Sequence, residues 1–305
     1  LNKLKLKNGI QHIEDDVLFQ EFGDKGLITL NRPKLNNCVN YTMLEKMIKV
    51  LTHWEKTKKV VIINGAGEKV FSSGGDVKAL YQLLRTSDTL EDVHQFMHEL
   101  YSLYYLIGTY KRPIVSLING LAMGASMGIF FHGKYSVATE TTQCGVPEVL
   151  VGLIPGFGAS HLFQKKLEGV DVKLTGIATH YVSSSKLPEV TKALLAPGDG
   201  DVKKILDEYD EQDPHAESCL SKYTKQLDEC FSGDSVEDII QRLKNDDSEW
   251  SQGVLKLLDK ISPTSLKVAK KAFEKEKELG LVESLKMEFI VAQNMMIKKS
   301  DFEEG

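Results

Sequence analysis

The sequence predicts an α/β fold with a helical C-terminal region. Two apolar runs rich in β-branched residues, "VVIING" at 60–65 and "PIVSLING" at 113–120, are typical of buried strands, and both end in glycine. Segments with helical spacing of apolar residues alternate with these runs, as in folds that repeat a strand and a helix. Beyond about residue 185 only helical patterns follow. We therefore predict a core over residues 1–185 and a helical lid or docking region over residues 186–305.

The N-terminal part is expected to form a hairpin and then a helix. Residues 17–30, "VLFQEFGDKGLITL", place short apolar runs on both sides of Asp24–Gly26, which has the composition of a turn. After "NRPKLNN", apolar side chains recur every three or four residues, which gives a helix one apolar face. These side chains are Leu44, Met47, Leu51 and Trp54.

The strand–helix unit is repeated later in the chain. Residues Leu90–Ile107 show helical spacing, "PIVSLING" follows as a strand, and Ala122–Phe131 is expected to be the helix that leaves it. A third unit has "YSVAT" at 135–139 as its strand and "CGVPEV" at 144–149 as the loop after it. Binding sites of α/β folds gather at such strand ends.

The helical region contains five segments with an apolar stripe. The first, "GDVKKILDEYDEQ", begins at residue 200, and the last, "LVESLKMEFIVAQNMM", covers residues 281–296. Ser262–Pro263 has the pattern of a helix cap followed by proline in the first turn, which predicts the start of a helix there.

Composition narrows the classes of function. With 305 residues, a formal net charge of -5 and a pI near 6.0, the chain offers no electrostatic case for nucleic-acid binding, so direct RNA contact is not predicted. The four cysteines form no CxxC pair, and His132 and His180 lack an acidic partner at metal-ligand spacing. We therefore expect a reducing compartment and predict no metal site.

One uncharged run, Pro113–Phe131, is long enough to raise the question of a membrane span. It contains Asn119, two serines and three glycines, which suit a buried strand that turns into a buried helix. We therefore favour the buried reading and predict no membrane partner.

Three glycine-rich loops follow the predicted strands, at 64–80, 119–129 and 145–160. Glycine lets a ligand approach the backbone closely, and the first residues of a following helix carry N–H groups without partners. Two such N–H groups from separate loops would form an oxyanion hole. Tight turns would also explain the glycines of any one loop taken alone.

Glu148 is the only carboxylate between Glu140 and Lys165. It lies among prolines and apolar residues in "GVPEVLVGLIPGFGASH" at 145–161, where a charge is unfavourable unless it has a function. Loss of solvent would raise the proton affinity of this carboxyl group, as suits a general acid or base. We therefore predict that Glu148 is catalytic.

The chain resembles the crotonase superfamily and, within it, the 3-hydroxyisobutyryl-CoA hydrolase family. The resemblance covers residues from about 14 to the last, and it rests on "LNRPKLNNCVN", "INGAGEKVFSSGGDVKAL", "KRPIVSLINGLAMGASMGI", "YSVATE", "VPEVLVGLIPGFGAS", "GIATHYV" and "ISPTSLK". It implies a crotonase fold of repeated ββα units that binds a coenzyme A thioester as substrate or ligand and needs no further cofactor. The oxyanion N–H groups would fall on Gly75 and Ala125, with Gly124 beside them, and Glu148 would bind or activate the acyl group.

The sequence departs from this family at three site positions. Gly156 stands where the hydrolases have an aspartate that assists hydrolysis, and no other carboxylate is nearby in the sequence. Leu100 stands where they have a second acid, although Glu99 is adjacent and a shift of one residue would restore it. Ala125 replaces a glycine and keeps its N–H. These changes predict a catalytically degenerate site, because loss of a general acid or base lowers the rate about 100- to 10,000-fold.

Other departures lie outside these three positions. His161 could replace the missing base, but an isolated histidine in an apolar segment is more often structural. Between Gly169 and Val170 the family has a further helix, and it also continues beyond "DFEEG". Both features lower the expectation of an intact site.

Two functions are therefore weighed. We favour a structural or binding component, because the acid/base group that assists hydrolysis is lost. The segments "GGDVKALY", "LIGTYKRP" and "GFGASH" are similar to a hydrolase-like protein of the small subunit of some mitochondrial ribosomes, which makes this function concrete. Its partners would be protein neighbours in that assembly. The alternative is an active acyl-CoA thioester hydrolase of valine breakdown. The resemblance implies the mitochondrial matrix in either case.

Overall fold

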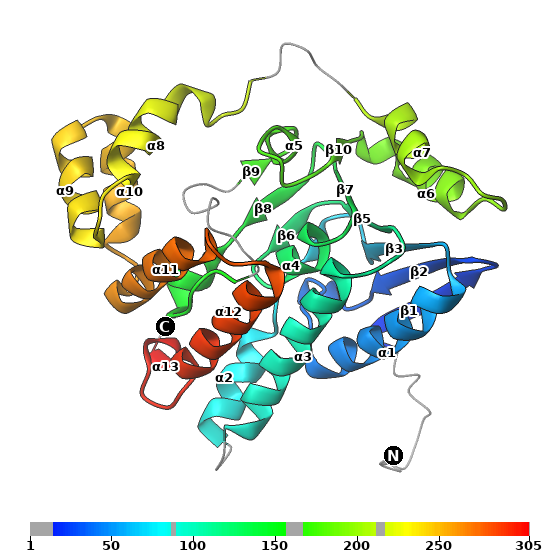
Figure 1. Ribbon diagram of the computed structural model, residues 1–305, viewed down its shortest axis with the longest axis horizontal. Helices are drawn as coiled ribbons and strands as arrows, with labels where there is room; N and C mark the ends of the chain where they lie inside the picture. The colour runs from blue at the N-terminus through cyan, green and yellow to red at the C-terminus, as the bar shows by residue number, and fades with distance from the viewer. Residues whose placement is uncertain (1–14, 87–89, 157–166, 212–216, 305) are drawn as a thin grey trace.

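The computed structural model describes residues 15–86, 90–156, 167–211 and 217–304 and has the predicted α/β architecture (Figure 1). Six strands form one sheet in the order β1-β2-β3-β5-β7-β10, and four form a second sheet in the order β4-β6-β8-β9. Successive strands alternate between the sheets, because β3, β5 and β7 belong to the first and β4, β6 and β8 to the second. This alternation is the repeated two-strand unit of the crotonase fold.

All strands are short, and most pairs are parallel; only β1–β2 and β8–β9 are antiparallel among the described strands. The larger sheet contains β1 (Val17–Phe22), β2 (Lys25–Leu30), β3 (Val60–Gly65), β5 (Ile114–Ile118), β7 (Tyr135–Ala138) and β10 (His180–Tyr181). The smaller sheet contains β4 (Val70–Ser72), β6 (Leu121–Met123), β8 (Gln143–Gly145) and β9 (Leu167–Glu168). Because β4, β6 and β8 run parallel, the loops that follow them leave from the same edge.

The N-terminal hairpin is confirmed, but its turn differs from the prediction. Phe22 pairs with Lys25, so the turn is Gly23–Asp24, and Gly23 adopts a φ of 61°. Gly26 lies within β2, where a Cβ would come within 2.4 Å of the Trp54 ring. The glycine that the composition assigned to the turn instead makes room for Trp54.

The first helix, α1 (Tyr41–Thr57), buries the predicted apolar face. Asn40 caps it, since its Oδ1 accepts a hydrogen bond of 2.9 Å from the Met43 N–H. The buried residues are Met43, Leu44, Met47, Leu51 and Trp54. The spacing of apolar residues was therefore sufficient to predict both the helix and its buried side.

The helix predicted over Ala122–Phe131 begins later than expected. Leu121–Met123 form β6, which pairs with β4 and β8, and α4 covers only Ser126–Phe131. Pairing with two neighbouring strands fixes these residues in an extended conformation, which the apolar run alone does not reveal. Pro113–Phe131 is thus shared by two strands and a short helix, and none of the described helices is both long and apolar enough to span a bilayer.

After β10 the described chain forms helices only, whereas α2, α3, α5, η1 and η2 lie earlier in the chain. The α-helices not yet given are α2 (Val77–Thr86), α3 (Glu91–Gly108), α5 (Asp171–Leu174), α6 (Leu187–Leu195), α7 (Val202–Tyr209), α8 (Thr224–Phe231), α9 (Val236–Asp246), α10 (Glu249–Leu258), α11 (Pro263–Glu276), α12 (Leu281–Met295) and α13 (Asp301–Glu304). The 3-10 helices are η1 (Pro33–Leu35), η2 (Pro147–Val151), η3 (Ser184–Lys186) and η4 (Ser221–Tyr223). Ser262 caps α11 as predicted, because its Oγ accepts from the Ser265 N–H at 3.0 Å.

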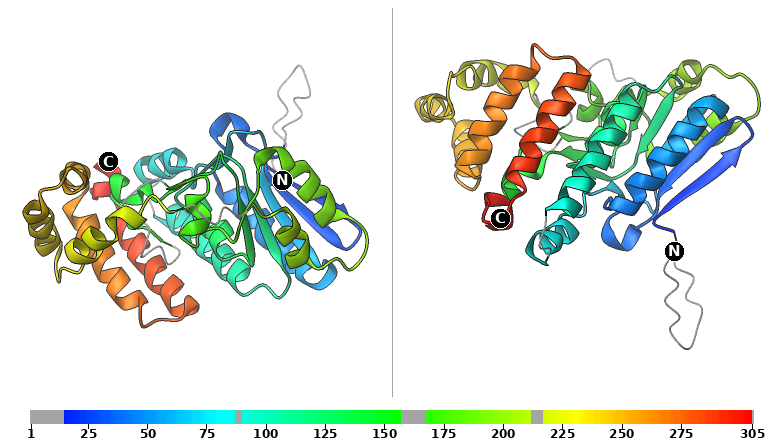
Figure 2. Two further views of the ribbon diagram at one scale, coloured as in Figure 1. Left: turned by 90° about the horizontal axis from the view of Figure 1, so that it is seen from above. Right: turned by 60° about the horizontal axis from the view of Figure 1, so that its bottom comes forward.

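The C-terminal helices pack in three places. Val190, Leu194 and Leu206 of α6 and α7 pack on one face of the larger sheet. α8, α9 and α10 enclose a small core of their own at the other end of the molecule (Figure 1). α12 lies along α3, as Figures 1 and 2 both show. This last contact carries side chains of the helical region to the loops after β4, β6 and β8.

Candidate active site

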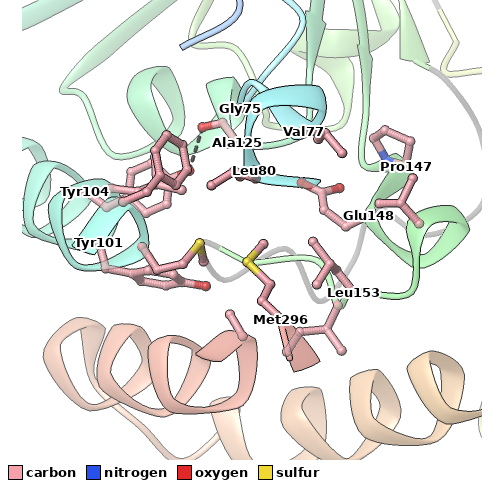
Figure 3. Close-up of a pocket in the computed structure, with 18 of the residues that line it drawn as sticks. Gly75, Val77, Leu80, Tyr101, Tyr104, Ala125, Pro147, Glu148, Leu153 and Met296 are labelled. Atoms are coloured by element: carbon pink, nitrogen blue, oxygen red, sulfur yellow. Dashed lines mark hydrogen bonds between the residues drawn. The ribbon is translucent and has the colours of Figure 1, made fainter. Parts of the chain in front are cut away.

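A cavity of about 140 Å³ lies where the loops after β4, β6 and β8 meet α3 and α12 (Figure 3). Its walls are mainly apolar, and its volume is well below the ~300–1,000 Å³ typical of sites for drug-sized ligands. It therefore has room for a small group and not for a large ligand. Six residues predicted from the sequence line it: Gly75, Leu100, Gly124, Ala125, Glu148 and Gly156.

The loop that carries Gly75 is held by the residue that follows it. Asp76 accepts a hydrogen bond of 3.1 Å from the Ala79 N–H in the first turn of α2. The same carboxylate forms an ion pair of 2.9 Å with Arg32, which comes from the "NRPKLNN" segment. These two contacts hold Asp76 in place and so restrict the backbone at the adjacent Gly75.

Ala125 is held by an aromatic side chain. It directly precedes α4, and the Tyr104 hydroxyl donates a hydrogen bond of 2.6 Å to its carbonyl oxygen, drawn as a dashed line in Figure 3. A Cβ at Gly128 would come within 2.4 Å of the Tyr104 ring. Gly128 thus makes room for Tyr104, and Tyr104 in turn orients the peptide unit of Ala125.

Gly75 and Ala125 lie side by side. The Cβ of Ala125 is 3.9 Å from the position that a Cβ on Gly75 would occupy. Within the part of the chain that the structure describes, no oxygen accepts a hydrogen bond from the N–H of either residue. Two backbone donors from separate loops are thus available at one edge of the cavity, which is the arrangement that stabilises a developing oxyanion.

Glu148 lies on η2, and its side chain points into the cavity (Figure 3). Its backbone is held by Gly152, whose N–H donates to the Glu148 carbonyl. Its Oε2 atom is inaccessible to solvent and has no hydrogen-bond partner among the described residues. Burial raises the pKa of Glu148 to about 7, because the ionised form has lost its water. The group can therefore both accept and return a proton near neutral pH.

Gly124 must be glycine for two reasons. Its φ of 54° lies in the left-handed region, and a Cβ there would come within 3.0 Å of Glu148 Oε1. Its N–H donates a hydrogen bond of 2.9 Å to the Gly145 carbonyl, which joins the loop of Ala125 to the loop of Glu148. This glycine therefore sets the separation between the carboxyl group and the backbone donors.

The wall formed by α3 carries no acid toward the cavity. Leu100 is 5% exposed and lines the cavity. Glu99 instead accepts a hydrogen bond of 3.0 Å from the Gln95 side chain on the outer side of the helix. A shift of one residue between Leu100 and Glu99 therefore does not place a carboxylate in the site.

The surroundings of Gly156 differ from the sequence expectation. A Cβ at Gly156 would lie 2.8 Å from the Tyr101 hydroxyl and 3.7 Å from Oε2 of Glu288. The expectation that no other carboxylate is near Gly156 is therefore wrong in space, although it holds along the sequence. Glu288 lies on α12, and the packing of α12 along α3 brings it there.

Comparison with known proteins agrees with this arrangement. Residues 25–305 match the model of the enoyl-CoA hydratase/isomerase family. The chain belongs to this family. Among its curated relatives is the mitochondrial 3-hydroxyisobutyryl-CoA hydrolase of Danio rerio, 37% identical, with 95% of this chain and 81% of the relative covered. The enzyme of the same name from Homo sapiens is 33% identical, with 95% and 80% covered.

Solved structures of a dehydratase and a hydratase share the fold. A carnitinyl-CoA dehydratase from Mycobacterium thermoresistibile has a TM-score of 0.87 and 32% identity, with 95% of this chain and 88% of that chain covered. An enoyl-CoA hydratase from Rhodobacter sphaeroides has a TM-score of 0.85 and 25% identity, with 95% and 87% covered. The crotonase fold expected from the sequence is therefore confirmed.

Two tyrosines of the cavity wall, Tyr101 and Tyr104, were not predicted as site residues from the sequence, and neither was Glu288 behind the wall. Glu288 left a signal, because it occupies a core-facing position of α12 with Leu285 and Ala292, all buried. A carboxylate among apolar residues was the same signal that identified Glu148. His161, considered as a replacement base, lies outside the described residues. At Gly169 and Val170, where the resemblance adds a helix, β9 leads directly into α5.

Proposed function

We propose that this protein hydrolyses the thioester bond of a short acyl-CoA in the mitochondrial matrix, with 3-hydroxyisobutyryl-CoA as the candidate substrate. The observation that carries the proposal is Glu148, whose carboxyl group has a pKa of about 7 and points into a cavity edged by two free backbone N–H groups. The names of the relatives, which are 3-hydroxyisobutyryl-CoA hydrolases described as mitochondrial, support the substrate and the compartment. The small cavity suits the acyl group, so the coenzyme would lie outside it.

The reaction needs one water molecule, the carboxyl group of Glu148 and the N–H groups of Gly75 and Ala125. Ionised Glu148 takes a proton from water as the water oxygen bonds to the thioester carbon. The carbonyl oxygen gains negative charge, which the N–H groups of Gly75 and Ala125 stabilise without reorganising. The carbon–sulfur bond then breaks, and the departing thiolate takes the proton from Glu148. The products are free coenzyme A and the carboxylic acid, and Glu148 is ionised again.

The test is steady-state release of free thiol from 3-hydroxyisobutyryl-CoA. We expect wild-type turnover on the order of 1 per second or more. Glu148→Gln keeps the shape of the side chain but cannot accept the proton, so kcat should fall about 100- to 10,000-fold. Glu283→Gln, an exposed change on α12, is the matched control and should leave kcat unaltered. No turnover by folded wild-type protein, or equal turnover by Glu148→Gln, would contradict the proposal.

A second candidate is supported by Gly156 and Leu100, which lack the two acids that the resemblance leads one to expect. In this case the protein binds without catalysis, as a component of the small subunit of the mitochondrial ribosome. Because its net charge is -5, protein neighbours would hold it there rather than RNA. Co-sedimentation with purified mitochondrial small subunits, together with absence of turnover, would favour this candidate over the hydrolase.

A further inference from the structure

A buried carboxyl group stands behind the cavity wall at Gly156. Oε2 of Glu288 lies 3.7 Å from the point at which a side chain on residue 156 would begin. The backbone of Gly156 does not have a positive φ, so a side chain there is conformationally permitted. The side chain of an aspartate at this position would begin 3.7 Å from Glu288, but its Cβ would be 2.8 Å from the Tyr101 hydroxyl, which must shift or be removed. The carboxyl group missing from one loop is thus present nearby on another element.

Glu288 does not line the cavity, but the nearby Tyr101 does. The exposed fraction of Glu288 is 0%. The Tyr101 hydroxyl does line the cavity and lies 2.8 Å from the same point at Gly156. Burial raises the pKa of Tyr101 well above its usual range, and the negative charge of Glu288 raises it further. The hydroxyl therefore stays protonated beside this buried carboxyl group.

A second acid interacts with Glu288. Burial raises the pKa of Glu276, the last residue of α11, and Glu288 is the side chain that acts against this rise. Both carboxyl oxygens of Glu276 are buried and have no hydrogen-bond partner among the described residues. Because two neighbouring buried carboxyl groups do not readily ionise together, we expect at most one of the pair to be charged.

We propose that Glu288 is the second carboxyl group of this site and that it acts through the Tyr101 hydroxyl to hold the attacking water. The inference rests on the hydrolase function proposed above. Figure 3 shows Tyr101 and Glu148 on opposite walls of the cavity, so a water between them can be gripped from both sides. Glu148 takes one hydrogen of this water, and the Tyr101 oxygen accepts a hydrogen bond from the other. Glu288 is then a positioning residue, and Tyr101 is the group that touches the water.

The first experiment measures kcat and KM for three variants. Glu288→Gln and Tyr101→Phe should each lower kcat at least about 100-fold with little change in KM, as expected for loss of a group that assists proton transfer. The double variant should be no worse than either single variant, because the two residues act as one unit. The exposed Glu283→Gln change on the same helix is the control. A purely structural role would lower the melting temperature and the active fraction and would not produce this non-additivity.

The second experiment returns the carboxyl group to residue 156. In the Glu288→Gln/Tyr101→Phe background, the lost hydroxyl leaves space beside Gly156, where a Cβ otherwise meets it at 2.8 Å. Adding Gly156→Asp should then raise kcat at least about tenfold, whereas the isosteric Gly156→Asn should not, since only the carboxylate can act as the assisting group. Circular dichroism and melting temperature confirm that the compared variants are folded.

The outcomes separate the two proposals. If wild type is active and Glu288→Gln keeps kcat within about threefold, the role of Glu288 is overturned and the hydrolase function stands. Equal kcat for the Gly156→Asp and Gly156→Asn variants overturns it as well. If folded wild type has no turnover, the hydrolase function fails, and the role of Glu288 fails with it. If Glu288→Gln does not fold, the Tyr101→Phe variant with and without Gly156→Asp decides by the same criteria.

Discussion

Gly75 and Ala125 at one edge of the cavity offer backbone N–H groups, whereas the wall at Leu100, Tyr101, Gly156 and α12 offers side chains. The first side keeps its donors although a glycine of the family pattern is alanine here, because substitution of a side chain does not remove an N–H. The second side has Leu100 and Gly156 at the two positions where the resemblance leads one to expect acids. A backbone donor therefore does not depend on the side chain at its position, whereas an acid does.

The largest expected effect comes from removing one backbone donor. Ala125 has a φ of -52°, close to the value that proline requires, and its N–H has no acceptor among the described residues. Ala125→Pro should therefore keep the fold and lower kcat about 100- to 1,000-fold, as loss of one oxyanion donor does. Ala125→Gly keeps the N–H and should stay within about threefold of wild type. Full activity of Ala125→Pro in thiol-release assays would exclude this residue as a donor.

The next effect is the free energy of unfolding that the protein loses by burying the ionised carboxyl group of Glu148. Its pKa rises from 4.5 to about 7 on folding, so the native state binds more protons between these values and stability falls as pH increases through this window. Glu148→Gln avoids this loss and should be more stable than wild type by up to about 3 kcal/mol near pH 8. The difference should shrink below about 1 kcal/mol near pH 5. Urea unfolding at both pH values measures it, and a pH-independent difference would contradict the burial of this charge.

A smaller effect is expected from a change at Gly128, which makes room for Tyr104 and its hydrogen bond to Ala125. Gly128→Ala would place a Cβ within 2.4 Å of the Tyr104 ring and disturb its hydrogen bond to Ala125. Such overpacking costs about 1–3 kcal/mol of unfolding free energy. Gly253→Ala, on an exposed face of α10 with nothing within 4 Å of the new Cβ, should instead stabilise by about 0.5–1 kcal/mol. If both variants shift stability alike, Tyr104 does not depend on Gly128.

The smallest expected effect is a difference between Glu148 and Glu288 in how they affect the pH dependence of kcat/KM. Glu148 must be ionised to accept a proton, so kcat/KM should fall about tenfold per pH unit below its pKa. The midpoint should lie near pH 7, the value to which burial raises the pKa of Glu148. Glu288→Gln should lower the plateau and leave this midpoint nearly in place, because Glu148 sets it. A midpoint near the ordinary value of 4.5 would show that Glu148 is solvated in the working enzyme.

Much of the fold followed from local patterns in the sequence. Leu44, Met47, Leu51 and Trp54 predicted α1 because the helical period places them on one side of the helix. Two predictions were wrong. Gly26 was assigned to the turn, but it lies in β2 and makes room for a distant tryptophan. The helix was expected to begin at Ala122, but Leu121–Met123 pair with strands far along the chain. Patterns within a few residues therefore predicted elements, and contacts between elements accounted for the errors.

The sequence by itself determined that Glu148 is an isolated acid in an apolar loop, that glycine-rich loops follow the strands, and that Gly156 carries no carboxyl group. These properties depend on residue type and short spacing alone. Only the tertiary structure decided that Gly75 and Ala125 lie side by side and that Glu288 stands behind Gly156. Such proximity is set by the packing of α12 along α3 and by the register of the smaller sheet, and neither can be read from the spacing of residues in one segment.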